Sequence, residues 1–125
     1  LTPGTHGSTF GGNPLVTGVA SSVLDVFEND LILDNVMKMS QYFESEFKSK
    51  IMSYSVVKEL RIKGLMIGIG LDENIIDCSK LTQKALEDKL LINITGNSIR
   101  MLPPLIISKK EIDILINKII KLITI

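Results

Sequence analysis

The strongest constraint on the fold is an uninterrupted apolar run, LMIGIGL, from Leu65 to Leu71. A short apolar run bounded by turn residues is typical of a strand covered on both faces. Lys63-Gly64 before it predicts a turn, and the segment 56–61 on the other side of that turn predicts a neighbouring strand. Glycines within the run indicate places where another group packs close to the backbone. We therefore expect a sheet with this run as a central strand.

Four other segments have apolar residues at helical spacing: 14–29, about 31–49, 79–90 and the stretch after Ser108. Asn13 before Pro14 predicts a capped start for the first helix, and Ser108 with Glu111 predicts a capping box for the last. The side chains expected to face inward are Leu33, Val36, Ser40, Phe43 and Phe47 in the second helix, Leu81, Ala85 and Leu86 in the third, and Ile112, Leu115, Ile116, Ile119 and Ile123 in the last.

A hairpin is predicted between the third and last helices, with strands at 91–95 and 98–101 joined by a Gly96-Asn97 turn and stopped by Pro103-Pro104. The expected order is therefore α-α-β-β-α-β-β-α. This order predicts an α+β fold, in which a small antiparallel or mixed sheet has helices packed on it. The length of 125 residues fits one domain, and 45% hydrophobic residues can build a core.

Composition excludes several classes of function. The formal net charge is zero, which disfavours nucleic-acid binding driven by bulk charge. The uncharged stretch 1–24 is rich in Gly, Pro, Ser, Thr and Asn, so it predicts neither a membrane span nor a signal peptide. Cys78 is the single cysteine and cannot form an internal disulfide. We expect a cytoplasmic protein that binds no nucleic acid and no membrane.

The glycine-rich opening contains the most informative local chemistry. The run GSTFGGNP, from Gly7 to Pro14, places two hydroxyls and several flexible backbone amides before a helix N-terminus. Such groups suit a phosphate, because amides, hydroxyls and the positive end of the helix dipole all favour an anion. The run is neither a Walker A loop nor a dinucleotide fingerprint. On local chemistry alone, a plain linker before a capped helix is the favoured alternative.

Three motifs in order resemble those of the class III pyridoxal-phosphate aminotransferases. They are GTHGSTFGGNP (4–14), ELRIKGLMIG (59–68) and SIRMLPPL (98–105). The first resembles the hallmark glycine loop of the family. The others resemble its arginine and glycine-leucine strand, and its arginine and double-proline turn. The resemblance covers essentially the whole chain and is strongest to the C-terminal part of the acetylornithine and ornithine group.

The resemblance implies a fold and a set of binding residues. Residues 1–30 would be the cofactor-phosphate loop and connecting helix at the end of the large domain, and residues 31–125 the C-terminal small domain of a fold-type I aminotransferase. In the family, the Ser-Thr pair of the glycine loop reaches the cofactor phosphate of the neighbouring subunit, a role that falls on Ser8 and Thr9. The arginine before the double proline binds the substrate's α-carboxylate, a role that falls on Arg100. The alternative for Arg100 is a surface arginine beside a turn.

The implied activity belongs to a longer protein. That parent would use pyridoxal 5′-phosphate to transfer an amino group from N-acetylornithine to 2-oxoglutarate in arginine biosynthesis, as a homodimer. The Schiff-base lysine and the acidic partner of the pyridine nitrogen lie upstream of the glycine loop in the family. The chain starts in mid-loop without an initiator methionine, so we expect a piece that lacks both residues and is inactive alone. No catalytic residue is assigned to it.

Two alternatives remain open at this point. The amino donor of the parent could be ornithine, succinylornithine or 4-aminobutyrate, because substrate choice in the family depends partly on residues outside the chain. The chain could also be a non-catalytic α+β module that binds a partner or a small anion. Upstream sequence with a cofactor lysine would favour the enzyme.

The remaining chemistry-bearing residues are predicted to be structural, and no metal site is expected. A lone loop histidine, a lone cysteine and a short acidic run lack the partners or spacing of a catalytic or metal site. Two methionines in the second helix are predicted to be ordinary packing residues, and one arginine is predicted to end a strand at the turn. In order, these residues are His6, Cys78, Asp72 with Glu73 and Asp77, Met37 with Met39, and Arg61.

Overall fold

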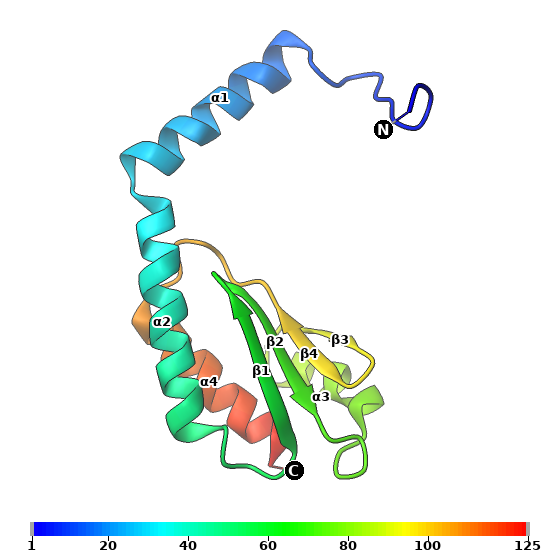
Figure 1. Ribbon diagram of the computed structural model, residues 1–125, viewed down its shortest axis with the longest axis vertical. Coiled ribbons are helices and arrows are strands. Elements are labelled where there is room, and N and C mark those ends of the chain that lie inside the picture. The colour runs from blue at the N-terminus through cyan, green and yellow to red at the C-terminus, as the bar shows by residue number, and fades with distance from the viewer. Residues whose placement is uncertain (1, 125) are drawn as a thin grey trace. The chain divides into compact units, whose positions relative to one another are not determined.

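The computed structural model describes residues 2–124, which form two compact units that meet between residues 33 and 34 and are described separately. The first unit holds the glycine-rich loop, all of helix α1 and the first two residues of α2, and the second holds the rest of α2, the sheet and the other helices (Figure 1). In chain order the elements are α1 (Pro14–Asn29), α2 (Ile32–Lys50), β1 (Val57–Lys63), β2 (Met66–Leu71), a 3₁₀ turn (Cys78–Lys80), α3 (Leu81–Glu87), β3 (Asn93–Thr95), β4 (Ser98–Met101) and α4 (Lys109–Ile123).

The strands form one antiparallel sheet in the order β1-β2-β4-β3. The apolar run of β2 lies between β1 and β4, which confirms its prediction as a central strand. The predicted α+β class is confirmed, and the sheet is antiparallel throughout rather than mixed. Two-residue turns join β1 to β2 and β3 to β4, each with a glycine at positive φ, Gly64 at 56° and Gly96 at 58°.

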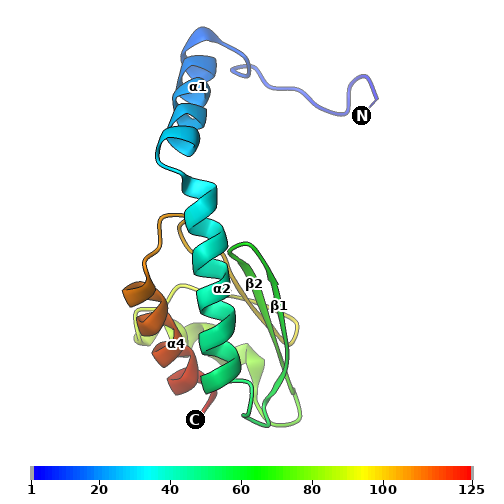
Figure 2. The same ribbon diagram turned by 60° about the vertical axis from the view of Figure 1, so that its left-hand side comes forward.

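Helices α2 and α4 lie on one side of the sheet (Figure 2). Their apolar faces meet alternate side chains of β2 and β4, because successive residues of a strand point to opposite faces. The largest side chains that are almost fully buried in this core are Phe43, Phe47, Ile51, Ile67, Ile69, Leu71, Leu81, Ile99, Ile112, Ile116 and Ile119. The inward face predicted for the last helix is confirmed at every position.

The predicted inward orientation is wrong for two residues, Leu33 and Leu86. Leu33 is 62% exposed, while Ile32 and Met39 of the same helix are buried. Ile32, Val36, Met39 and the two phenylalanines form one stripe of helical spacing, and Leu33 lies about 100° around the helix from it. Leu86 is 53% exposed for the same reason, since Leu81 and Ala85 already occupy the inward stripe of the short helix α3. Met37, predicted to pack, is 57% exposed.

Strand β1 is longer than predicted. It runs to Lys63, so Arg61 lies inside the strand rather than at its end. The turn begins only at Gly64, whose positive φ favours glycine. An added Cβ there would also lie 3.2 Å from Cγ1 of Val36. Leu60 and Ile62 pack against the core, so the side chain of Arg61 between them lies on the sheet face opposite the helices.

The predicted caps are present. The side chain of Asn13 accepts a hydrogen bond from the backbone N–H of Val16 at 3.0 Å, which caps α1 before Pro14. Ser108 and Glu111 form the reciprocal capping box at the start of α4. Hydrogen bonds from Ser108 hold the pKa of the Glu111 carboxyl below its usual range. The cap therefore stabilises the helix while Glu111 is ionised and is lost as the pH falls through that lowered pKa.

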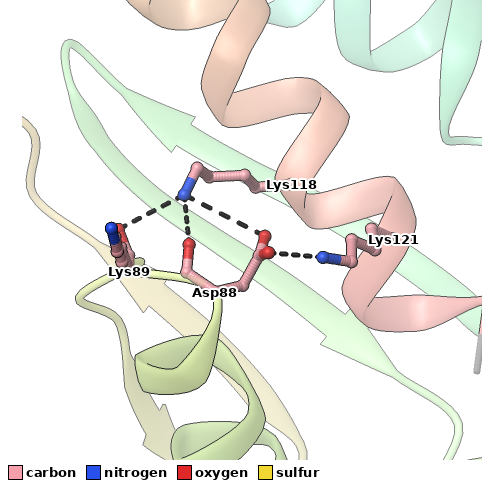
Figure 3. A network of polar contacts seen from close by, with 4 residues as sticks. All are labelled: Asp88, Lys89, Lys118 and Lys121. Carbon is pink, nitrogen blue, oxygen red and sulfur yellow. Dashed lines mark hydrogen bonds and ion pairs between the residues drawn. The ribbon is translucent and has the colours of Figure 1, made fainter.

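Polar contacts join α4 to the end of α3 (Figure 3). The ammonium of Lys118 donates to the backbone carbonyls of Asp88 and Lys89, which follow the last turn of α3. Lys121 pairs with the carboxylate of Asp88, and this hydrogen bond lowers the pKa of Asp88. Cations at a helix C-terminus are favourable because the unpaired carbonyls carry partial negative charge. Helix α3 ends where Lys89 takes a positive φ of 56°. The lysine contacts then hold this end on α4.

A second polar contact joins α2 to α4. The hydroxyl of Tyr42 donates to Oδ1 of Asp113 at 2.7 Å, and Nζ of Lys109 lies 5.0 Å from the centre of the tyrosine ring. The hydrogen bond to Asp113 raises the pKa of Tyr42 to about 12. Both helices that cover the sheet are thereby fixed to one another at their outer edge, beside the apolar core.

Candidate functional site

The face of the sheet opposite α2 and α4 contains a row of polar residues built around a glycine. In register, Arg61 of β1 pairs with Gly68 of β2, Gly68 pairs with Arg100 of β4, and Arg100 pairs with Asn93 of β3. Paired residues of neighbouring strands point to the same face. The only arginines of the chain, Arg61 and Arg100, therefore lie on one face on either side of a residue without a side chain.

The two guanidinium groups differ in their partners. Nη2 of Arg61 donates to the hydroxyl oxygen of Ser98 at 2.9 Å, and its Nε lies 3.4 Å from Oε1 of Glu59. Within residues 2–124, the side chain of Arg100 makes no hydrogen bond and no ion pair, and the residue is exposed. Arg61 is thus engaged with the protein, while the donors of Arg100 are available to a ligand.

A shallow hollow lies over this face. Its volume is about 580 Å³, and its lining includes Glu59, Arg61, Gly68, Ser98 and Arg100. The single carboxylate among these side chains is already paired with Arg61. A hollow with one unpaired guanidinium suits an anion, and the planar fork of an arginine matches a carboxylate through two parallel hydrogen bonds.

The glycine-rich loop forms a separate set of donors, in the first unit. The hydroxyl oxygen of Ser8 accepts a hydrogen bond from the backbone N–H of Gly11 at 2.9 Å, which leaves the hydroxyl proton of Ser8 for another acceptor. Within the described part of the loop, the Thr9 hydroxyl makes no hydrogen bond. An added Cβ at Gly11 would lie 3.0 Å from the Ser8 side chain. Two hydroxyl donors before the N-terminus of α1 fit a phosphate chemically.

The acidic run lies in an exposed turn after β2, and its two aspartates are bound to neighbouring residues. Asp72 pairs with Lys58 at 2.7 Å and accepts from the backbone N–H of Asn74, and these contacts lower its pKa. Asp77 caps the 3₁₀ turn through the backbone N–H of Ser79. Among the residues that the structure describes, no group of three metal-ligating side chains comes together. Both aspartates therefore have structural partners.

The other singled-out residues have no catalytic partner among the described residues. His6 is exposed in the loop. Burial raises the pKa of the Cys78 thiol, and nearby acidic charges act in the same direction, which disfavours the reactive thiolate. In the described part of the chain, no helix combines the length and the apolar character needed to cross a membrane.

Comparisons with known proteins agree with the resemblance of the three motifs. The family described as aminotransferase class-III matches residues 1–123. The acetylornithine aminotransferase of Caldanaerobacter subterraneus subsp. tengcongensis is 44% identical over 112 residues, which are 89% of this chain and 28% of that protein. The ornithine aminotransferase of Staphylococcus carnosus is 41% identical over 97% of this chain and 30% of its own length. The chain spans less than a third of the curated relatives it matches.

Solved structures give the same result for the fold. The acetylornithine aminotransferase of Elizabethkingia anophelis superposes with a TM-score of 0.81 at 33% identity, over 99% of this chain and 32% of that one. The ornithine δ-aminotransferase of Plasmodium falciparum gives a TM-score of 0.87 at 31% identity, over 99% of this chain and 33% of that one. The fold and the matched motifs are those of a pyridoxal-phosphate-dependent transaminase. The chain belongs to the class III aminotransferases and is similar to their acetylornithine and ornithine members.

Sequence reasoning missed one feature of the open face, the placement of the two arginines in one row on either side of Gly68. Arg61 was expected to be structural at a strand end, whereas it lies in register with Gly68, and only the central strand β2 separates it from Arg100. A signal was present in the sequence. Alternation along each strand places Glu59 and Arg61 on one face of β1, and Ser98 and Arg100 on one face of β4. The pairing of the strands was needed to bring these faces together.

Proposed function

We propose that this chain is the C-terminal part of a pyridoxal-phosphate enzyme that transfers an amino group from N-acetylornithine to 2-oxoglutarate, in arginine biosynthesis. The observation that carries the proposal is the unpaired guanidinium of Arg100 on the open sheet face, within the SIRMLPPL motif. The 44% identity to an acetylornithine aminotransferase supports N-acetylornithine as donor. The 41% identity to an ornithine aminotransferase makes ornithine the second candidate.

Arg100 binds the α-carboxylate of the substrate in this proposal. Both the amino donor and 2-oxoglutarate carry a carboxylate, so one arginine can serve each of them in turn. The planar guanidinium fixes the plane of the carboxylate through two parallel hydrogen bonds. It thereby orients the rest of the substrate. Bound pyridoxal phosphate supplies the electron sink for the transfer.

Ser8 and Thr9 hold the cofactor phosphate in this proposal, in the active site of the second subunit of a homodimer. Residues 1–30 then form the cofactor-phosphate loop and connecting helix, and residues 31–125 form the C-terminal small domain. The donor chemistry of the loop supports this assignment, because both hydroxyls can donate to phosphate oxygens. The chain itself contributes binding residues and no catalytic residue, and we place the enzyme in the cytoplasm.

Replacing Thr9 with valine in the full-length protein is expected to weaken cofactor binding. A hydrogen bond to a charged group contributes about 1.5–3 kcal/mol, so the Kd for pyridoxal phosphate should rise roughly 10- to 100-fold. An absorbance titration of the cofactor-free protein measures this Kd. Thr5→Val is the matched control, because the Thr5 hydroxyl lies in the same loop but donates to the carbonyl of Thr2 at 2.7 Å. Equal Kd values for the two variants would contradict the assignment.

The choice of amino donor is tested with the full-length protein and pyridoxal phosphate. Initial rates of glutamate formation from 2-oxoglutarate are measured with N-acetylornithine, ornithine, succinylornithine and 4-aminobutyrate. The proposal predicts the highest kcat/KM for N-acetylornithine. A higher value for ornithine would transfer the assignment to the second candidate. No glutamate with any donor would contradict the proposed function.

A further inference from the structure

We propose that Arg61 is a positioning residue for the carboxylate site. Its side chain covers Gly68 and pairs with the carboxylate of Glu59, and this keeps the guanidinium of Arg100 available to the substrate. The inference rests on the proposed function of Arg100. It adds a role for a residue that touches no substrate in this account.

The side chain of Arg61 lies along the sheet face over Gly68. A Cβ added at Gly68 would stand 3.7 Å from Nε and 3.8 Å from Nη2 of Arg61, which is ordinary van der Waals contact. Beyond Gly68, Nη2 reaches β4 and donates to Ser98 at 2.9 Å. The arginine therefore spans the central strand and links β1 directly to the strand of Arg100.

Ser98 is two residues before Arg100 on the same strand and the same face. The hydrogen bond from Arg61 consequently ends beside the side chain of Arg100. This hydrogen bond holds the guanidinium of Arg61 beside Ser98. Because like charges repel, the guanidinium of Arg100 is kept from lying over Gly68.

Glu59 is the carboxylate that would compete with a substrate. It lies on the same face of β1 as Arg61, and its Oε1 is 3.4 Å from Nε of Arg61. Strands β1 and β4 are two strand spacings of about 4.8 Å apart. The long side chains of Arg100 and Glu59 can together bridge this distance, because the residue between the strands is a glycine. If Arg61 were absent, Arg100 could fold over Gly68 and pair with Glu59. That internal pair would neutralise the cation that the substrate needs.

The test is a set of variants of the full-length enzyme. Arg61→Gln is expected to raise the KM of the amino donor and of 2-oxoglutarate together, by about 2- to 5-fold, since the competing pair with Glu59 is exposed, with a smaller change in kcat. Arg61→Lys keeps the charge but cannot contact Glu59 and Ser98 at once, so an intermediate KM is expected. The double variant Glu59→Gln/Arg61→Gln removes the competing carboxylate and should restore most of the lost affinity.

Lys58→Gln is the matched control. Lys58 is on the same strand, is ion-paired to Asp72 at 2.7 Å and has a side chain 59% exposed, against 61% for Arg61, but it does not line the hollow. Its KM values should equal those of the wild type. A KM in Arg61→Gln no higher than in Lys58→Gln would overturn the inference, as would a double variant with no restored affinity. Loss of activity with every donor in the wild type would instead contradict the proposed function.

Discussion

Replacing Arg100 with alanine in the full-length enzyme is expected to lower kcat/KM by roughly 100- to 1,000-fold, because two charge-assisted hydrogen bonds of about 1.5–3 kcal/mol each are removed and the losses are only partly additive. The loss should affect the amino donor and 2-oxoglutarate alike, since in the proposed function the same guanidinium binds a carboxylate of each. Most of it should appear as a higher KM. Steady-state kinetics with each substrate varied in turn measures the effect.

Arg100→Lys separates geometry from charge. An ammonium keeps the positive charge but cannot form the two parallel hydrogen bonds of a guanidinium. We therefore expect a kcat/KM between those of the wild type and the alanine variant. If Arg100→Ala had the kinetics of the control Lys58→Gln, Arg100 would be a surface arginine beside a turn and the carboxylate site would lie elsewhere.

Replacing Phe47 with alanine is expected to destabilise the sheet unit by about 3–5 kcal/mol, the usual cost of removing a large buried ring and leaving a cavity. Phe47 is fully buried, and its ring centre lies 6.0 Å from that of Phe43. Both rings pack in the core that holds β2 and β4, so the loss also loosens the strands on either side of the site.

Hydrogen exchange in the full-length protein measures this destabilisation locally, without assuming that the whole protein unfolds in one step. Protection of the backbone amides of β2 and β4 should fall roughly 100-fold or more in Phe47→Ala. Glu44→Ala is the control on the same helix, since its ion pair with Lys48 is exposed and contributes little. Unchanged protection in Phe47→Ala would show that these rings do not hold the sheet.

Local signals predicted much of the fold. The apolar run of β2, the hairpin at Gly96-Asn97 and the capping box of α4 each depend on neighbouring residues, and all were recovered. The inward face of α2 was predicted only in part, because Ile32 and Leu33 are both apolar neighbours and either could begin the buried stripe. Tertiary packing buries Ile32 and leaves Leu33 exposed, and the local sequence pattern does not predict which of the two is buried.

The candidate site was predictable only in part. Arg100 and the Ser8-Thr9 pair were singled out because they stand in short motifs that resemble a known family. The role of Arg61 depends on its register with Gly68 and on the hydrogen bond to Ser98, 37 residues away in sequence. Strand register is set by pairing across the sheet, so composition and spacing along one strand could not predict which residues share a row.

The central claim is that Arg100 binds the substrate's carboxylate on the open face of the sheet. N-acetylornithine has one free amine, so an analogue with a hydroxyl in its place keeps the carboxylate and cannot react. A crystal structure of the full-length protein with pyridoxal phosphate and this analogue tests the claim directly. We predict carboxylate oxygens within hydrogen-bond distance of two nitrogens of Arg100, with Arg61 still bonded to Ser98. A carboxylate bound elsewhere, with Arg100 facing solvent, would contradict the account.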